Sequence, residues 1–342
     1  MKRFAYIISI FALTVCALLI WDTSGAAKTK SKNKKGIAYF NEPAIGFAAE
    51  EYDLNKDGKF SQKELAKITK LQLKDAEQSE IDLKELKYLK NLRSLEIWET
   101  YGKRRDIKNI SALYKLKKIK SIRIEYCNLS KGFKTAQWKN LKKLELTNCK
   151  LKKLSLKKNV KLEHLACDEN NIPSLNLTKN VKLKSFSGSL APNQLKKLDL
   201  SKNKKITSLS LNEIGDVEFS NIKLYQNGSK LQKLEFLWTQ EREEIDLTGW
   251  NLTSLKEITC TGADEDNEWY SPSHLKKVIV GDAPQLESAS FSVPTLEQIQ
   301  ILNAFYLKEL WCRGSQLKKI TLSVLPVDIH YNSDSCEVEI IK

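Results

Sequence analysis

The chain has 342 residues, of which 41% are hydrophobic and 29% are charged. A chain of this size and composition can bury a substantial core, which argues against an intrinsically disordered protein. Lysine and arginine number 57 against 42 acidic residues, so the formal net charge is +15. An excess of this sign favours anionic partners such as cell-wall polymers, membranes or nucleic acid, although most charge runs are simply solvated surface.

The first residues have the layout of an export signal. Two basic residues precede an uncharged apolar run at 4–21, and small residues follow that run. This order predicts that residues 1–26 are a secretory signal peptide, cleaved after Ala26 or Ala27. The apolar run is long enough to leave an uncleaved membrane anchor as the alternative. In either case the rest of the chain is predicted to be secreted or displayed at the cell surface.

A basic linker follows the signal. The stretch KTKSKNKKG at 28–36 contains no apolar residue, so residues 27–38 are predicted to be a flexible linker.

The stretch DLNKDGKFSQKE at 53–64 has the spacing of an EF-hand calcium loop. Oxygen-bearing side chains occupy its first, third, fifth, ninth and twelfth places, and a glycine at the sixth permits the sharp turn. The alternative is an ordinary helix start, because a serine and a glutamate three residues later also form the capping-box pattern. The predicted Ca²⁺ ligands are Asp53, Asn55, Asp57, Lys59 (at the seventh place, where the loop binds through a backbone carbonyl), Ser61 and Glu64.

The surroundings of this loop predict a structural calcium site rather than a sensor. A helix is expected before the loop, with Asn41 as its cap and Pro43 in its first turn. The exit helix has room only for residues 61–67, and no second loop follows to form a groove that could open. Lys56 and Lys59 lie among only three acidic residues, which indicates a weak affinity, on the order of 10⁻⁴ to 10⁻³ M.

A repeated hexamer is the strongest pattern in the chain. Apolar residues fill its first, fourth and sixth places, and the copies LKKLEL, LEHLAC and LKSFSG begin at 141, 162 and 183, in steps of 21 residues. A fixed period of this length is typical of a repeat protein. Further copies begin at 68, 92, 119, 206, 231, 255, 275, 296, 307 and 317, and half-repeat copies begin at 151, 172 and 195.

The hexamers and the residues after them resemble the leucine-rich repeat family, whose pattern is L-x-x-L-x-L-x-x-N/C-x-L. Cys127, Cys149 and Asn170 fill the N/C place after three successive hexamers. The resemblance implies that leucines are buried between neighbouring turns, and that the Asn or Cys satisfies backbone groups at the corner.

We therefore predict an α/β repeat fold: a right-handed leucine-rich-repeat solenoid with a parallel β-sheet. Apolar residues at helical spacing place a few outer helices at 81–89 and 107–116. An EF-hand-like helix-loop-helix cap at 39–67 is expected to precede repeats at 68–342.

The cysteines fall into two groups. Cys127 and Cys149 occupy the corner, while Cys167, Cys260 and Cys312 occupy the inward sixth place of a hexamer. Both are positions for a small buried hydrophobe, so these five are predicted to be buried thiols rather than disulfide partners. No C-x-x-C pair is present to indicate a metal site. The pattern leaves open whether Cys336 pairs.

The second, third and fifth places of each hexamer point away from the core and line one open face of the sheet. Aromatic and arginine residues among mixed charges are typical of interface centres. The alternative is that these are solvated strand residues and that the later tryptophans pack under loops. The predicted ligand-binding residues are Glu96, Trp98, Arg123, Glu125, Tyr126, Lys143, Glu145, His164, Asp168, Trp238 and Trp311.

An export signal, one EF-hand or dockerin-like loop and a run of leucine-rich repeats resemble a group of secreted or cell-surface bacterial proteins. The resemblance implies a calcium-stabilised cap and the binding of an extracellular protein or glycan, with no small-molecule substrate. The chain ends CEVEIIK without a wall-sorting tail, so covalent wall attachment is not expected.

Two other functions are weighed against this one. A lysine-rich surface protein could bind anionic polymers through lysine rows built by the LKK copies at 141, 151, 195, 275 and 317. An enzyme is not predicted, because the chain has three histidines and no catalytic motif.

Overall fold

The computed structural model describes residues 37–74, 79–98, 104–189, 195, 197–213, 221–239, 242–263, 272–313, 316–331 and 336–341. The predicted signal peptide at 1–26 and nearly all of the linker at 27–38 lie outside these ranges. No helix within them is both long enough and apolar enough to cross a membrane.

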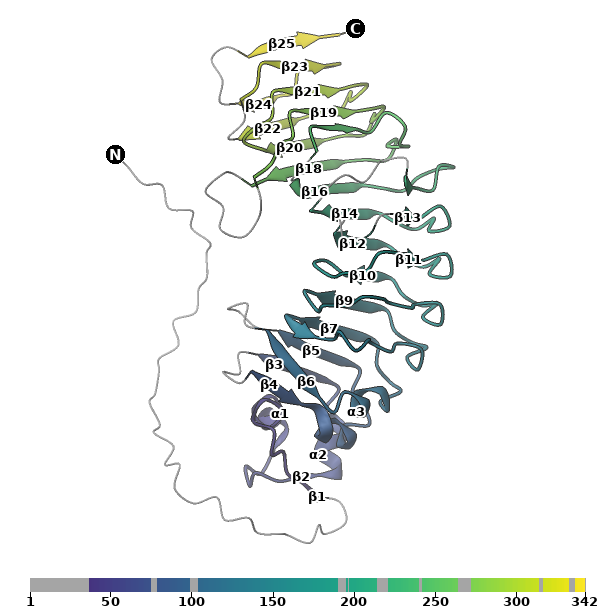
Figure 1. Ribbon diagram of the computed structural model, residues 1–342, viewed down its shortest axis with the longest axis vertical. Helices are drawn as coiled ribbons and strands as arrows, with labels where there is room; N and C mark the ends of the chain where they lie inside the picture. The colour runs from purple at the N-terminus through teal and green to yellow at the C-terminus, as the bar shows by residue number, and fades with distance from the viewer. Residues whose placement is uncertain are drawn as a thin grey trace, which may run out of the picture. The chain divides into compact units, whose positions relative to one another are not determined.

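A parallel sheet of 12 strands runs the length of the solenoid, and each turn of the chain adds one strand (Figure 1). We call it the main sheet. This architecture confirms the predicted parallel repeat solenoid. Its strands are β3 (Lys70–Lys74), β5 (Ser94–Trp98), β7 (Ser121–Glu125), β9 (Lys143–Thr147), β10 (His164–Ala166), β12 (Ser185–Ser189), β14 (Ser208–Asn212), β16 (Lys233–Thr239), β18 (Glu257–Gly262), β20 (Ser288–Ser292), β22 (Glu309–Arg313) and β24 (Asp328–Tyr331).

Alternation of side chains along each strand builds the core. In β5, Leu95 and Ile97 are fully buried, whereas Ser94, Glu96 and Trp98 face outward. Leu95 pairs in register with a leucine of β3 and an isoleucine of β7. Each buried leucine or isoleucine contributes about 1.5 to 3 kcal/mol through removal from water. The hexamer rule, with its first, fourth and sixth places buried, is confirmed.

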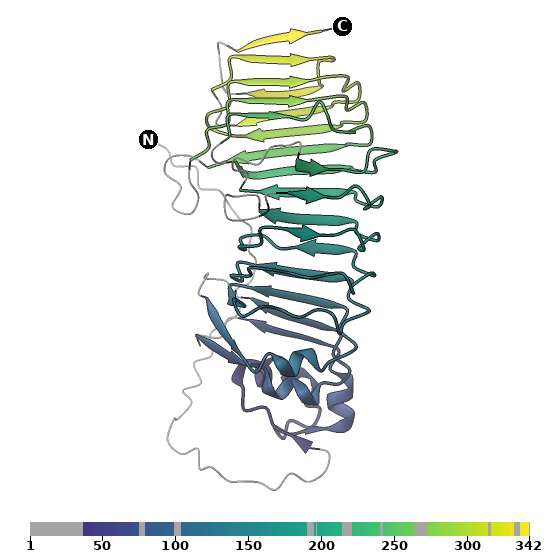
Figure 2. The ribbon, with the colours of Figure 1, turned by 45° about the vertical axis from the view of Figure 1, so that its right-hand side comes forward.

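The return side of the solenoid carries three smaller parallel sheets, so two layers enclose the core (Figure 2). The layers run in opposite directions because the chain reverses within each turn. The first contains β4 (Glu80–Asp82), β6 (Arg105–Lys108) and β8 (Cys127–Asn128); the second β11 (Leu175–Asn176), β13 (Leu198–Asp199) and β15 (Ile222–Lys223); the third β17 (Glu244–Asp246), β19 (Lys277–Val280), β21 (Gln298–Ile301), β23 (Lys319–Leu322) and β25 (Glu337–Ile340).

Three of the predicted hexamers belong to this return side. The copies at 275, 296 and 317 form β19, β21 and β23, and the main-sheet strand β20 comes from the stretch LESASF at 286–291 instead. The prediction that these three copies line the same sheet face as the other hexamers was wrong. Both layers bury alternate residues against the same core, so the same apolar pattern serves either layer.

Short helices occupy the N-terminal end. The cap contains β1 (Ile37–Ala38), α1 (Pro43–Ala49), the 3₁₀ helix η1 (Glu50–Tyr52), β2 (Phe60–Ser61) and α2 (Gln62–Lys67). The N-cap of α1 is Glu42, not the predicted Asn41. The side chain of Glu42 instead accepts a hydrogen bond from the backbone N–H of Asp82, and so ties the cap to the first turn.

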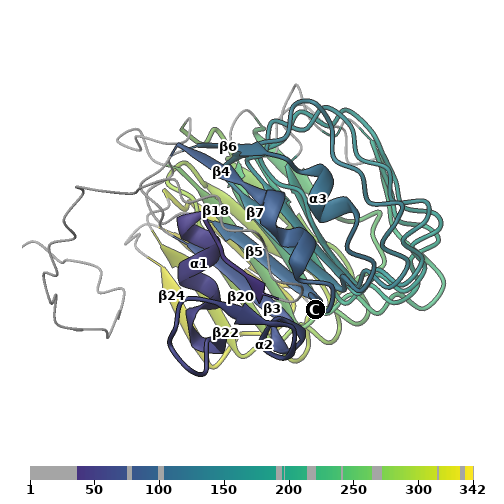
Figure 3. The ribbon, with the colours of Figure 1, turned by 90° about the horizontal axis from the view of Figure 1, so that it is seen from below.

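The outer helices are shorter than predicted. They are the 3₁₀ helix η2 (Leu83–Tyr88) and α3 (Ser111–Tyr114), which follow β4 and β6 and lie on the return side of the solenoid (Figure 3). Ile81 and Ile107 lie in β4 and β6 rather than in helices. The backbone N–H and C=O groups of these two strands pair with each other, so they do not need the hydrogen bonds of a helix.

Three buried asparagines hold the outer corners of the central turns. Asn159, Asn180 and Asn203 are at most 2% exposed, and we call them the asparagine ladder. The Nδ2 of Asn180 donates to the carbonyls of Leu156 (3.2 Å) and Asn159 (2.9 Å), one turn earlier. Asn203 repeats these bonds one turn later. Each asparagine thus satisfies two carbonyls that the bend takes out of the strand ladder.

All six cysteines of the described chain are free thiols. The five predicted to be buried are buried, which confirms that prediction, and Cys336 is half-buried. Burial raises the pKa of the Cys149 and Cys167 thiols, so they are not reactive thiolates at neutral pH.

Replacement of Asn180 by alanine should lower the free energy of unfolding by roughly 2 kcal/mol or more, because two buried carbonyls lose their donor. Urea unfolding followed by circular dichroism measures the loss. The matched control is Asn171→Ala at an exposed site, which should change stability by no more than about 0.5 kcal/mol. Equal losses in the two variants would show that the ladder contributes nothing specific.

Candidate functional site

The outward-facing side chains of the main sheet form one continuous surface, which we call the sheet face. Register brings the predicted residues together: Glu96, Arg123 and Glu145 lie side by side on β5, β7 and β9. Lys143 and His164 are neighbours on β9 and β10. Residues from separate repeats therefore share one surface patch at the N-terminal half of the sheet.

Trp98 is the centre of this patch. The Nζ of Lys74 lies 5.3 Å from the centroid of its ring, and the guanidinium carbon of Arg123 lies 5.5 Å from it. Both are cation–π distances. The indole N–H of Trp98 is buried and has no hydrogen-bond partner among the described residues. A buried donor without an acceptor is uncommon in folded proteins and leaves a specific hydrogen bond to be made.

Charged side chains around Trp98 are held in fixed positions. Arg123 donates two hydrogen bonds to Glu125, at 2.7 and 3.1 Å, and this contact raises the pKa of the guanidinium. Burial disfavours the charged form of Glu96, but hydrogen bonds from Gln72 and Lys70 outweigh it and hold the pKa of Glu96 below its usual value. The patch is therefore pre-ordered, which lowers the entropic cost of binding.

A groove adjoins the patch, between α1 and β3. Its volume is about 250 Å³, and its wall includes Phe47, whose side chain is 81% exposed. Phe47 was not among the predicted binding residues. Phe47 lies off the apolar face of α1 formed by Ile45 and Ala49, so a helical projection would have marked it as exposed. The groove is lined by Ala44, Phe47, Ala48, Glu51, Tyr52, Lys70, Gln72 and Lys74.

The middle of the sheet face holds a polar cluster around Asp168. Its carboxylate accepts hydrogen bonds from the Oγ of Ser187 (3.0 Å) and the Nδ2 of Asn212 (2.6 Å). Burial outweighs these bonds and raises the pKa of Asp168 to about 6. Nearby, the Nδ1 of His164 lies 2.8 Å from the Oγ of Ser185.

The C-terminal part of the face carries a second aromatic group. Trp311 stacks on His330 with ring centroids 3.9 Å apart and planes 15° from parallel, and Arg313 lies 5.1 Å from the Trp311 ring. Tyr126 lies at the bend after β7, where its φ of 51° turns the chain out of the strand. Trp238 falls within β16, but its side chain lies outside what the structure describes.

The loop at 53–64 has a turn of the expected kind. The N–H of Gly58, at φ 71°, donates to Asp53 Oδ2 (2.8 Å), and the N–H of Lys59 donates to Asp57 Oδ1 (2.8 Å). Phe60 pairs with Ala38 in an antiparallel ribbon, so β1 supports the loop from the side.

Glu64 forms the capping box that was the alternative explanation for this sequence. Its Oε2 accepts from the N–H and the hydroxyl of Ser61, and these bonds lower its pKa. Its Oε1 accepts from the N–H of Leu54 (3.1 Å). Within the described ranges, no three His, Cys, Asp or Glu side chains lie close enough together to hold a metal ion.

The LKK copies do not all lie in one row. The copy at 141 is in the main sheet, whereas the copies at 195, 275 and 317 form strands of the return side. Most of these lysines are also neutralised by glutamates. The ion pairs are Lys142 with Glu163 (2.8 Å), Lys143 with Glu145 (2.9 Å), Lys276 with Glu243 (2.8 Å), Lys277 with Glu244 (3.6 Å), Lys318 with Glu297 (2.8 Å) and Lys319 with Glu339 (2.9 Å).

Comparison of the sequence with protein families and with curated proteins gives no match. Solved structures match the fold at low sequence identity. Internalin C2 of Listeria monocytogenes has a TM-score of 0.51 and 20% identity over 68% of this chain and 100% of that one. The functional domain of InlJ from the same organism, described as including a cysteine ladder, has a TM-score of 0.49 and 18% identity over 84% and 75% of the two chains. The match to internalin C2 is a likeness of fold, that of a parallel-strand solenoid.

The raised pKa of Asp168 predicts a stability that depends on pH. Between about pH 4 and pH 6 the folded protein keeps a proton that the unfolded chain releases, so the free energy of unfolding falls as pH rises through this window. For a pKa of about 6 the fall is about 2 to 3 kcal/mol. Urea unfolding at pH 4 and pH 7.5 should show it in the wild type, and Asp168→Asn should remove it.

The control for this experiment is Asp199→Asn. A hydrogen bond from Ser201 lowers the pKa of Asp199, so its contribution is present at neutral pH and is lost as pH falls, opposite in sign to that of Asp168. A difference between wild type and Asp168→Asn that stays constant with pH would contradict the assignment.

Proposed function

We propose that this chain is an exported, non-enzymatic binding protein whose sheet face binds a protein or a glycan outside the cell. The observation that carries the proposal is the patch around Trp98, with its adjoining groove. Tryptophan and arginine are the residues that most often dominate binding energy at interfaces. Their position on a rigid sheet, rather than on a loop, favours a preformed site.

The shape of the patch favours a macromolecular ligand. The groove is open to the sheet face rather than enclosed, and Phe47 projects beside it. Small molecules are generally held in concave pockets that bury most of their surface. An exposed phenylalanine and an ordered tryptophan instead offer anchors to a protein side chain or a sugar ring.

We further propose that the loop at 53–64 binds one structural Ca²⁺ ion, with Asp53, Asn55, Asp57, Lys59, Ser61 and Glu64 as ligands. Asp53 Oδ1 is buried and makes no hydrogen bond with the described residues, as expected of an oxygen reserved for a cation. The carboxylates of Asp53 and Asp57 both accept hydrogen bonds from the backbone of the glycine turn, from the N–H groups of Gly58 and Lys59. Bound calcium would hold these oxygen atoms together and would therefore stiffen the cap.

Export is part of the same proposal. The signal-like segment at 1–26 supports secretion, and an uncleaved segment would instead anchor the protein at the cell surface. Either location presents the sheet face to extracellular partners.

Trp98→Ala should reduce capture of the specific partner at least 10-fold, as expected for loss of an interface anchor worth about 2 kcal/mol. The protein is immobilised and exposed to extracts of host and bacterial surfaces, and captured components are quantified by mass spectrometry. Lys118→Ala, an exposed site outside the main sheet, is the control and should capture as the wild type does. Partners retained equally by both variants do not bind through this patch.

Calcium binding should appear in isothermal titration as a single site with a Kd on the order of 10⁻⁴ to 10⁻³ M. Asp53→Ala should abolish the heat, because it removes the buried oxygen without a partner. Asp282→Ala, an exposed acid elsewhere in the chain, should leave the titration unchanged. Equal heats for wild type and Asp53→Ala would rule the site out.

A further inference from the structure

A second surface arises from a short motif in the central turns. At 158–161, 179–182 and 202–205 the sequence K-N-x-K carries a buried asparagine of the ladder between two exposed lysines. The copy at 139–142 differs, because Asn140 is exposed and Lys142 pairs with Glu163, and the copy at 32–35 lies outside the described ranges. The bend that hides the asparagine therefore projects both lysines into solvent.

The lysines of successive turns lie in two rows. The residues that follow the motif stack directly: the N–H of Lys184 donates to the carbonyl of Glu163, and the N–H of Thr207 donates to the carbonyl of Lys184. Neighbouring turns are about 4.8 Å apart, so each row presents one cation per turn. One row contains Lys158, Lys179 and Lys202, and the other contains Lys161, Lys182, Lys205 and Lys230; we call these seven residues the lysine face.

Within the part of the chain that the structure describes, the lysine face has no acidic partner. None of its seven side chains forms an ion pair with a described residue, whereas Lys142 and Lys184, on the next corner, both pair with Glu163. The segment 150–161 contains six lysines and no acidic residue. Asp199 lies on β13 of the return side, where hydrogen bonds from Ser201 lower its pKa and the charges of Lys223 and Lys197 add to that effect.

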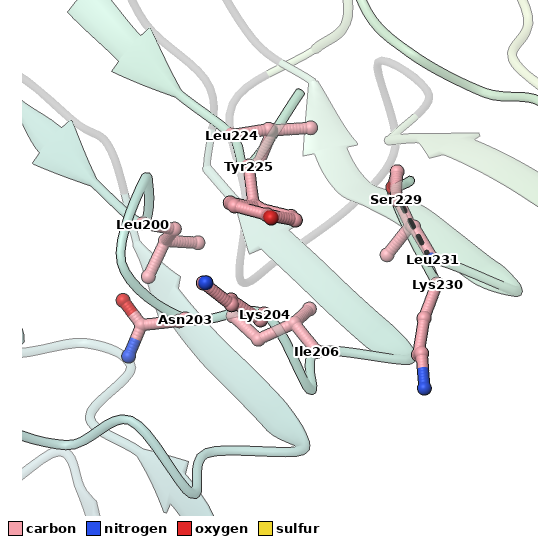
Figure 4. Close-up of a pocket in the computed structure, with 9 residues that line it drawn as sticks. All are labelled: Leu200, Asn203, Lys204, Ile206, Leu224, Tyr225, Ser229, Lys230 and Leu231. Atoms are coloured by element: carbon pink, nitrogen blue, oxygen red, sulfur yellow. Dashed lines mark hydrogen bonds between the residues drawn. The ribbon is translucent and has the colours of Figure 1, made fainter. Parts of the chain in front are cut away.

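The described residues next to Lys204 and Lys230 enclose only a small hollow. Lys204 lies over the ring of Tyr225, with its Nζ 5.4 Å from the centroid (Figure 4). The hollow between these two turns measures about 20 Å³, which holds about one water molecule. A ligand larger than a water molecule would lie across this hollow rather than enter it.

We propose that the lysine face binds a linear polymer that carries repeated phosphate groups. Rows of cations at one per turn match a chain of regularly spaced anions, and binding is driven by release of the counterions condensed on such a chain. The surface lies on the outer side, away from the patch around Trp98, so the proposal stands independently of the proposed function.

A flat membrane fits the same surface less well. Peripheral binding to membranes combines basic residues with inserted Trp, Phe or Leu side chains. Among the described residues, the large apolar side chains exposed between the rows are Val160 and Val181, at 47% and 48% exposure. The valines suit contact with a polymer backbone and are too short for deep insertion.

The test measures binding of long-chain inorganic polyphosphate to the purified chain, by fluorescence anisotropy between 50 and 200 mM salt. The wild type should show a steep linear fall of log K with log salt. The variant Lys161→Gln, Lys182→Gln, Lys205→Gln and Lys230→Gln should lower the magnitude of this slope by about 3, at roughly 0.7 per lysine, and weaken binding at least 10-fold at 50 mM salt.

The matched control changes four exposed lysines that already have glutamate partners: Lys256→Gln, Lys276→Gln, Lys308→Gln and Lys318→Gln. It removes the same net charge and should keep the wild-type slope to within about 1. If both variants lost the same affinity and slope, overall charge alone would explain polyphosphate binding, and the proposal would be overturned.

Two further measurements complete the test. Anionic phosphatidylglycerol vesicles should bind more weakly than polyphosphate at equal phosphate concentration; stronger vesicle binding that the first variant abolishes would assign the face to a membrane and overturn the proposal. Circular dichroism checks that the variants fold. If the fourfold variant does not, Lys182→Gln with Lys205→Gln should give about half the change in slope, and no change would count against the proposal.

Discussion

Contact between successive turns is the constraint on which this structure depends. Each turn buries leucine and isoleucine side chains against the turns before and after it, and backbone hydrogen bonds of the main sheet join the same neighbours. No turn can bury its apolar face alone, so the array is stable only as a stack. The asparagine ladder completes the stack where the chain bends, because it pairs carbonyls that the strands leave free.

This stacking also explains how binding surfaces arise from a repeated sequence. A residue at a fixed place in each repeat is brought next to its counterparts, so one row of the sheet joins Glu96, Arg123 and Glu145. Differences between repeats at that place therefore determine the chemistry of the surface that runs across the turns. The sheet face mixes aromatic and charged residues held in fixed contacts, whereas the outer corner repeats lysines that form no ion pair with a described residue. The two sides therefore suit partners of different chemistry.

The N-terminal cap contacts both the first repeat and the candidate binding surface. α1 lies at the first strand of the main sheet, and Glu42 and Glu85 bind backbone groups across the boundary between cap and repeats. The groove at this boundary contributes Phe47 and Tyr52 to the surface beside Trp98. Stiffening of the loop at 53–64 would therefore also steady one wall of the candidate site, through the helix that precedes it.

The sequence by itself determined the repeat, its period, the buried places of the hexamer and the burial of five cysteines, because side-chain alternation and leucine spacing are local properties. Tertiary structure decided which layer each hexamer joins, since both layers bury against one core, and so it moved the copies at 275, 296 and 317 to the return side. It also decided which lysines are neutralised, and it placed Phe47 in a groove shared with Lys74, whose ammonium group lies over the ring of Trp98. Ion pairs and grooves join residues from different turns, and the register between turns is fixed only when they stack.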